Sequence, residues 1–281
     1  MPKVSVIVPC YNMGKYIDET IDSVLKSTYQ DFEIVVVNDG STDEFTNKHL
    51  ADYNRPKTKV IHTKNQGLVG ARNTAIENSS GEYILPLDSD DMISENYIKE
   101  AVEYMDKNPN AGIVYCMAER FGDSQGIWEF PEYTTERMVQ QCLIFCSGFF
   151  RRKDCEKVGG YSVNMNYNYE DWDFWLKIIE LERDVYRIPK IHFFNRVRKD
   201  SITSTRDWGG RMKTMNRQLY LNHLELFAKY HTDPVTLSSE IKKLKSEKEE
   251  TIKWVYNTMD YKLGHALLQP FRFIKNLFKP S

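Results

Sequence analysis

The chain has 281 residues, of which 41% are hydrophobic and 28% charged, so it can bury the core of a catalytic domain of roughly 200 residues with an appendage. It contains no run of 18 apolar residues, which excludes a sequence segment that spans a membrane as a helix. The net charge of −2 is unevenly divided, because residues 1–205 carry 24 Lys/Arg against 32 Asp/Glu and residues 206–281 carry 14 against 8. The basic tail predicts an anionic partner, and without any nucleic-acid motif we expect a membrane surface and no nucleic acid.

Five cysteines are present, an odd number without repeated C-x-x-C spacing. This usage is typical of buried, reduced thiols and favours a cytoplasmic protein. The first apolar run, VSVIVP, is too short for a signal peptide, so we expect no secretion.

Strand and helix signals alternate along the first ninety residues. Short β-branched or apolar runs predict strands, and apolar residues at helical spacing predict helices. The expected strands are Val4–Pro9, Phe32–Val37, Lys59–His62 and Tyr83–Leu87, and the expected helices are Lys15–Ser27 and Val69–Asn78. This alternation predicts an α/β fold with a mostly parallel sheet flanked by helices, in which ligands bind beyond the carboxyl ends of the strands.

The later segments are less regular. We expect strands at Ala111–Ala118 and Ile188–Val197, a helix at Thr135–Phe145, and helical structure from about Arg206. The expected inward face there consists of Met212, Met215, Leu219, Leu221, Leu224 and Phe227. The charged sequence KKLKSEKEE reads as a solvated helix face or a hinge. The sequence thus divides into a catalytic domain, 1–205, and a helical C-terminal extension, 206–281.

Two carboxylates directly after a predicted buried strand form a candidate metal site. Asp88 and Asp90 follow the run YILPL, and alternate residues of an extended segment share one face. Mg²⁺ or Mn²⁺ favours such oxygen ligands and usually keeps phosphate oxygens in its shell. Acidic surface loops are common, so the D-x-D pattern by itself is weak.

A second acidic group opens a predicted helix in the sequence YEDWDFWLKI. Asp171 is the candidate general base, Glu170 is its rival, and Asp173 reads as structural. Acidic residues at a helix start also serve as caps that favour the helix dipole. The two roles are compatible, because a helix N-terminus would keep Asp171 ionised at neutral pH.

Two further residues have both a functional and an ordinary interpretation. Asp39 follows a predicted strand and could accept the imide N–H of uracil, although NDGSTD also reads as turn chemistry. Arg72 in the predicted helix could face phosphates or be an ordinary surface arginine.

Taken together and in order, six segments resemble the inverting glycosyltransferase family 2, which has the GT-A (Rossmann-like) fold. These segments are VSVIVPCYN, FEIVVVNDGSTD, NQGLVGARNTAI, YILPLDSDD, GGYS and YEDWDFWLKI, within residues 3–205. The resemblance implies a nucleotide-sugar donor, a divalent cation, a saccharide or lipid-linked acceptor, and inversion at the anomeric carbon.

The resemblance also implies roles for individual residues. Pro9, Tyr11 and Asn12 would line the nucleotide pocket, Asp39 would read the base, and Arg72 would lie near the donor. Asp88 and Asp90 would hold ribose and metal-bound diphosphate, and Asp171 would be the catalytic base. Ser147–Arg152, Glu170 and Trp172 would border the acceptor.

The chain departs from the family pattern near RVRKDSIT. Many relatives have a histidine where Arg198 stands, so this position would supply a fixed positive charge instead of a metal ligand. His192 reads as an ordinary strand residue. Asn38 replaces a common Asp, which we interpret as a harmless variant.

The last thirty residues combine apolar side chains with Lys and Arg, and Gly264 and Pro270 interrupt them. This pattern predicts two short helices in the membrane interface, or helices that dock on the enzyme itself or on a homodimer partner. Localisation would then be cytoplasmic, at the inner face of the cell membrane.

Two other functions were weighed. A nucleotidyltransferase can share the sheet topology, but the N-terminal segment has no Gly-rich, basic phosphate loop. A decayed glycan-binding scaffold is disfavoured by intact Asp39, Asp88, Asp90 and Asp171. Uracil and thymine share the edge that Asp39 would recognise, and among UDP, dTDP and GDP we expect a UDP-sugar donor.

Overall fold

A computed structural model describes residues 1–165, 169–199, 210–230, 234–258 and 262–263. The chain divides into two compact units, Met1–Phe227 and Ala228–Ser281. The first unit therefore includes helix α9 (Gly210–Asn222), which follows residue 205, the end expected for the catalytic domain.

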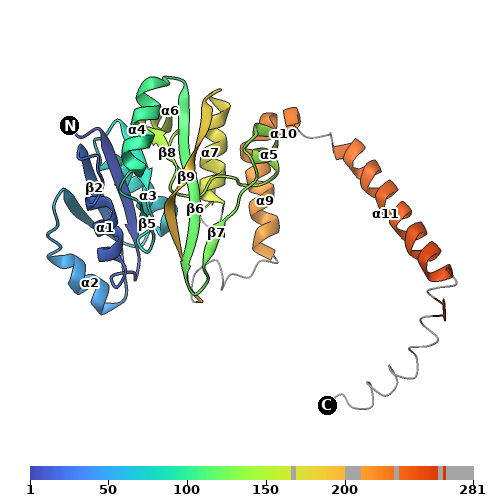
Figure 1. Ribbon diagram of the computed structural model, residues 1–281, viewed down its shortest axis with the longest axis horizontal. Coiled ribbons are helices and arrows are strands. Elements are labelled where there is room, and N and C mark those ends of the chain that lie inside the picture. Colours follow the sequence, from blue (N-terminus) through green and yellow to red (C-terminus); the bar gives the residue numbers. More distant parts are fainter. Residues whose placement is uncertain (166–168, 200–209, 231–233, 259–261, 264–281) are drawn as a thin grey trace, which may run out of the picture. The chain divides into compact units, whose positions relative to one another are not determined.

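The described residues of the first unit form one nine-stranded sheet (Figure 1). The strand order is β3-β2-β1-β4-β8-β6-β9-β5, and β7 pairs with β6. The strands are β1 (Val4–Cys10), β2 (Phe32–Asp39), β3 (Thr58–Thr63), β4 (Tyr83–Pro86), β5 (Met92–Ile93), β6 (Ala111–Gly122), β7 (Gly126–Trp128), β8 (Phe149–Arg151) and β9 (Asp184–Val197). Strands β3, β2, β1 and β4 are mutually parallel, whereas β8 is antiparallel to both β4 and β6. The mostly parallel sheet predicted from the sequence is confirmed.

Strand β1 lies where the direction of chain progression reverses. The chain leaves β1 toward β2 and β3 on one side and returns to β4 on the other. All seven residues of β1 are buried, as expected for a β-branched strand covered on both faces. Such a reversal opens a crevice at the carboxyl ends of the strands, where α/β proteins bind ligands.

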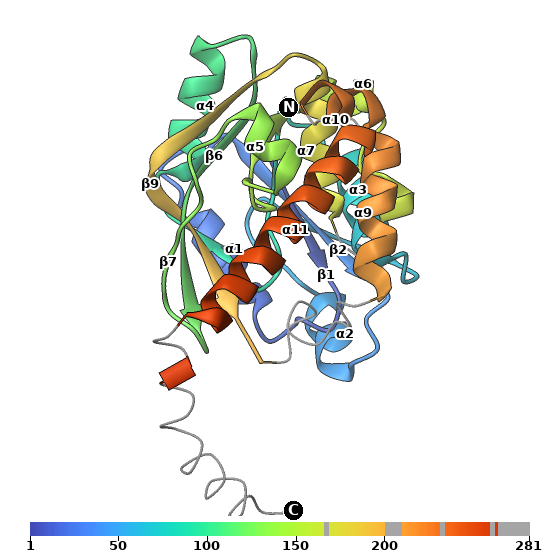
Figure 2. The same cartoon turned by 90° about the vertical axis from the view of Figure 1, so that its right-hand side faces the viewer.

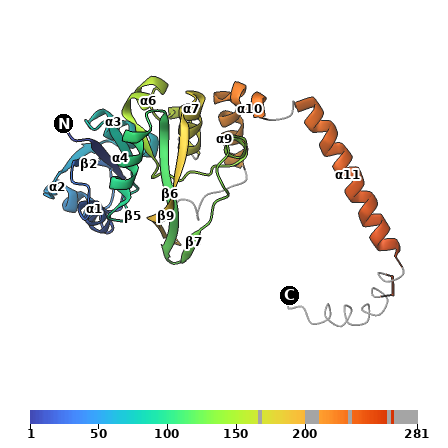
Figure 3. The same ribbon diagram turned by 45° about the horizontal axis from the view of Figure 1, so that its top comes forward.

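Helices cover both faces of the sheet. The helices of the described chain up to residue 230 are α1 (Ile17–Leu25), α2 (Glu44–Ala51), α3 (Gly67–Glu77), α4 (Tyr97–Lys107), α5 (Thr135–Gln140), α6 (Arg152–Val158), α7 (Glu170–Glu180), α9, and α10 (Leu224–Tyr230), with a 3₁₀ turn, η1, at Val163–Met165. Helix α3 packs on β1 and β2. Helix α4 lies on one side of β6 and α7 on the other (Figures 2 and 3).

Two sequence predictions are wrong in part. The helix expected over Thr135–Phe145 ends at Gln140, and Leu143, Ile144 and Phe145 are buried in irregular chain instead. The inward face expected after residue 206 is correct at Met215 and Leu219 of α9, but Leu221 of α9 and Leu224, the first residue of α10, are 54% and 50% exposed. The inward face continues through the buried His223.

The second unit contains α11 (Pro234–Asn257). The sequence KKLKSEKEE lies within it and is exposed throughout, which confirms a solvated helix. The expected helices of the tail fall mostly on residues 264–281, outside the described residues. Among the residues that the structure describes, none of the helices is long and apolar enough to cross a membrane.

Candidate active site

Asn12 joins the loop after β1 to the loop after β2. Its backbone is in the left-handed region (φ 56°). Its side-chain Oδ1 accepts from the backbone N–H groups of Thr42 (2.7 Å) and Asp43 (3.0 Å). Its own N–H donates to Ser41 Oγ at 3.0 Å. Asn12 therefore fixes the shape of this edge of the crevice, and contact with a nucleotide stays a prediction, as it does for Pro9 and for Tyr11, which is 41% exposed.

Asp39, the last residue of β2, is held in one orientation. Its Oδ1 accepts from the Gln66 N–H at 2.8 Å and from Thr63 Oγ1 at 3.1 Å. The next residue must be glycine, because Gly40 has φ 63° and a Cβ there would lie 2.4 Å from the nitrogen of Asn65. A carboxylate oriented in this way is suited to accept a hydrogen bond from a base edge.

Arg72 lies at the centre of the site and is fully buried on α3. Its guanidinium donates to Asp171 Oδ1 at 2.6 Å, to Asp88 Oδ1 at 3.0 Å and to Glu170 Oε1 at 3.3 Å. The interpretation as a surface arginine is wrong, because three carboxylates offset the cost of burying this cation. A direct role toward donor phosphates stays a prediction.

Asp171 lies in the first turn of α7, and its side chain is 20% exposed. Burial raises the pKa of Asp171 to about 8; the positive charge of Arg72 opposes this shift, and the nearby Glu170 and Asp88 add to it. Burial therefore acts against the expected effect of the helix N-terminus, which is to keep this group ionised at neutral pH. The desolvation of the carboxylate exceeds the stabilisation from helix dipole and arginine.

Aromatic side chains flank the start of α7. Tyr169, which precedes the helix, has φ 65°, and its ring meets that of Trp172 edge-on at 5.2 Å. Trp172 Nε1 donates to the Met138 carbonyl at 2.7 Å, which fixes the indole. Trp172 and Glu170 thus lie beside Asp171, as expected for residues that border an acceptor, although that role is not tested.

The acidic residues that follow β4 differ in their exposure and in their ion-pair partners. Asp88 is 34% exposed at its side chain, whereas Asp90 Oδ2 pairs with Arg198 Nε at 3.0 Å. Burial, with Asp88 nearby, raises the pKa of Asp90, and Arg198 opposes that shift. Arg198 therefore supplies a positive charge at this site.

The oxygen donors at this edge fit a hard cation. Ligand atoms of Asp88, Asp91 and Cys146 lie within 4.8 Å of one another. Asp91, however, is buried and already accepts from the backbone N–H of Arg196 at 2.8 Å. Burial raises the pKa of the Cys146 thiol, so it stays protonated and is a poor ligand for Mg²⁺ or Mn²⁺. Of the two predicted metal ligands, Asp88 belongs to this group, whereas Asp90 does not and pairs with Arg198. Metal binding by Asp88 and Asp90 therefore stays a prediction.

Asp91 and Cys146 were not among the residues predicted for the site. The third acid of DSDD was the available signal for Asp91, whereas a lone cysteine in FCSG gives none. All five cysteines are free thiols, as predicted. His192 is confirmed as a strand residue, because it is buried in β9, stacks on Tyr97 and bonds Ser94.

The acceptor-side expectation for Ser147–Arg152 is wrong for its central residues. Phe149, Phe150 and Arg151 form strand β8 and are buried. Arg151 donates to the backbone carbonyls of Ala111 (2.8 Å), Met105 (2.8 Å) and Asn108 (3.0 Å). This arginine stabilises the sheet and does not face the crevice.

The mostly parallel sheet, with its carboxylates gathered beyond the carboxyl ends of the strands, defines a GT-A-type α/β protein. Solved structures of S. aureus TarS (residues 1–349) share this fold: the complex with UDP-GlcNAc gives a TM-score of 0.68 at 23% identity, covering 81% of this chain and 71% of that one. The sequence model of Glycosyl transferase family 2 matches residues 5–193, and the chain belongs to this family.

Curated relatives are considerably longer than this chain. A chondroitin synthase of Escherichia coli is 29% identical over 262 residues, which cover 89% of this chain and 37% of the relative. A hyaluronan synthase of Pasteurella multocida is 26% identical over 294 residues, which cover 98% and 28%. The chain spans about a third of the length of these relatives.

Proposed function

We propose that the chain is an inverting glycosyltransferase of polysaccharide synthesis that moves a sugar from a UDP-sugar to a hydroxyl group of a glycan or lipid-linked saccharide. Family membership supports the transfer reaction. The names of the synthases above support a hexosyl or N-acetylhexosaminyl donor, and the TarS complex with UDP-GlcNAc supports a uridine nucleotide.

One observation carries the proposal. Arg72 bonds Asp171 and Asp88, which are 83 positions apart in the sequence. The candidate base and the first acid of the D-x-D pair are thus neighbours, so one substrate complex can contact both. A nucleotide bound along β1 and β2, with its base at Asp39, would end in a diphosphate at this point.

In this mechanism Asp171 accepts the proton of the acceptor hydroxyl while the oxygen attacks the anomeric carbon. The bond between that carbon and the diphosphate oxygen breaks, and the electron pair leaves with UDP. Attack from the face opposite the leaving group converts an α-linked donor into a β-linked product. A pKa near 8 suits a general base that works close to neutral pH.

The leaving diphosphate gains negative charge, which positive groups must balance. Arg198 lies at the acidic end of β4 and supplies one of them. A divalent cation held by Asp88 and Asp90 would supply Lewis-acid stabilisation there.

The test is Asp171→Asn, assayed for release of UDP from a panel of UDP-sugars in Mn²⁺. We expect kcat to fall by about a thousandfold, because the base is lost, while donor affinity by calorimetry changes little. Glu156→Gln, an exposed acid on α6, is the control with unchanged turnover. Unchanged turnover in Asp171→Asn would exclude Asp171 as the base.

Two product measurements separate the alternatives. Release of pyrophosphate in place of UDP would indicate a nucleotidyltransferase. An α-linked product from an α-linked donor, identified by NMR, would contradict inversion.

A further inference from the structure

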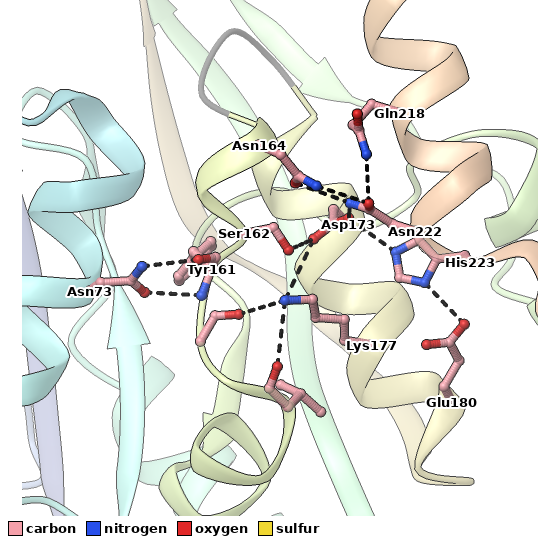
Figure 4. Close-up of polar contacts among 12 residues, drawn as sticks. Asn73, Tyr161, Ser162, Asn164, Asp173, Lys177, Glu180, Gln218, Asn222 and His223 are labelled. Atoms are coloured by element: carbon pink, nitrogen blue, oxygen red, sulfur yellow. Dashed lines mark hydrogen bonds and ion pairs between the residues drawn. The ribbon is translucent and has the colours of Figure 1, made fainter.

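Helix α9 packs against the helix that carries the candidate base. It lies beyond residues 5–193, the part matched by the family. Met215 and Leu219 are 5% and 2% exposed on its inner face. Figure 4 shows polar side chains at the end of this helix pointing toward Asp173 and Glu180 of α7.

The first point of attachment is Tyr169, immediately before Glu170. The Tyr169 hydroxyl donates to Met212 Sδ at 3.1 Å. Tyr169 is in the left-handed region, an uncommon conformation for a large side chain that neighbouring contacts must hold.

The second point is Asp173, two residues after Asp171 and fully buried. It accepts from Asn222 Nδ2 at 2.5 Å and from Ser162 Oγ at 2.6 Å, and His223 Nε2 lies 3.2 Å from it (Figure 4). The interpretation of Asp173 as structural is consistent with these contacts.

His223 extends the attachment along α7. Its Nδ1 lies 3.0 Å from Glu180 Oε1, so each ring nitrogen faces a carboxylate. Burial lowers the pKa of His223, but the hydrogen bonds to Asp173 and Glu180 raise it by more. A protonated imidazole can donate to both partners at once. Within the part of the chain that the structure describes, Lys177 also faces this cluster, with its Nζ 3.9 Å from Asp173 Oδ2.

Arg72, the ion-pair partner of Asp171, is also held in place through its neighbour in the chain. Asn73, next to Arg72, donates to the Tyr161 carbonyl and accepts from its N–H, both at 2.9 Å (Figure 4). Helix α3 is therefore tied to the segment that leads into α7.

We propose that His223 and Asn222 are positioning residues for Asp171, and that α9 holds Tyr169 and Asp173 so that the turn between them keeps Asp171 against Arg72. This rests on the proposed function for its effect on catalysis. Small displacements of a reacting group cost much of the rate. The residues proposed to bind the nucleotide, Asn12 and Asp39, lie at the ends of β1 and β2, and the hydrogen-bond partners given above for them are not in α9.

The kinetic test uses His223→Gln and Asn222→Ala, with Leu221→Ala, an exposed position of the same helix, as control. We expect kcat to fall at least about tenfold in both variants, with the Kd for UDP in Mn²⁺ changed by less than about twofold. The control keeps wild-type values. Asn222→Ala retains the contacts of His223, so this variant provides the kinetic test if His223→Gln does not fold. Wild-type kcat in a folded variant, with only lower thermal stability, would overturn the proposal.

Hydrogen–deuterium exchange of a peptide covering residues 169–175 provides a readout that needs no activity. Exchange should be faster in His223→Gln and Asn222→Ala than in the wild type or Leu221→Ala. If the wild-type protein is inactive and the two variants still exchange faster than it does, the proposed function is refuted and the positioning role stands. Equal exchange in all four proteins would refute the positioning role itself.

Discussion

Arg72 donates to Asp171 Oδ1 at 2.6 Å through one guanidinium nitrogen and to Asp88 Oδ1 at 3.0 Å through the other. One buried cation thus joins the start of α7 to the end of β4. The relationship gives Arg72 a structural and an electrostatic task together, because it neutralises carboxylates that would otherwise repel each other at close range.

Arg72→Lys keeps the charge but loses the planar fork that reaches both carboxylates. We expect the free energy of unfolding, measured in urea, to fall by on the order of 3 kcal/mol, because a carboxylate loses its partner in a buried site. We expect kcat to fall by about a hundredfold as Asp171 shifts. Arg137→Lys, on the exposed surface of α5, is the matched control. Wild-type kcat in Arg72→Lys would show that the pairing with Asp171 is dispensable.

The pH dependence of turnover should report the Asp171 cluster. Because the base must be deprotonated, kcat/KM should rise with pH and level off above an apparent pKa, whose ligand-free value is about 8. Glu170 raises the pKa of Asp171 through like charge, so Glu170→Gln should move the rise to lower pH. A pH–rate profile of each protein in the same Mn²⁺ buffer measures this shift. A rise that stays in place, or moves to higher pH, would contradict the assignment.

Asp39→Asn should weaken the recognition of a uracil base. Gln66 and Thr63 fix the carboxylate, so an amide in its place presents a donor where an acceptor is required. We expect UDP to bind about tenfold more weakly, and the preference of the protein for UDP over GDP to shrink, by calorimetry. Asp52→Asn, at the end of α2, controls for loss of charge. Unaltered UDP affinity would remove Asp39 from the nucleotide pocket.

Arg198→Ala tests whether the charge beside Asp90 serves the diphosphate. Loss of the guanidinium should weaken the binding of UDP by about tenfold and leave the binding of uridine nearly unchanged, because only the diphosphate carries the opposing charge. Arg187→Ala, near the other end of β9, should bind both as the wild type does. Equal losses for UDP and uridine would indicate a structural effect on β9.

Local patterns in the sequence predict the main strands and helices and the chemical groups that these elements carry. The β-branched runs fixed β1, β2 and β4, and the acids placed after them, Asp39 and Asp88, lie at one edge because parallel strands end together. The apolar spacing of α7 likewise predicts that Asp171 lies in the first turn of a helix, which is where the structure places it.

Which of these groups meet, and how far each carboxyl is removed from water, depends on the tertiary packing. The partners of Arg72 come from α7 and the loop after β4, and two partners of Asp173, Asn222 and His223, lie about fifty positions away at the end of α9. Periodicity in a sequence reports the face of an element that is buried, but it does not name the element that covers that face. The burial that raises the pKa of Asp171 and the attachment of α9 both depend on that packing, so neither is encoded in a local pattern.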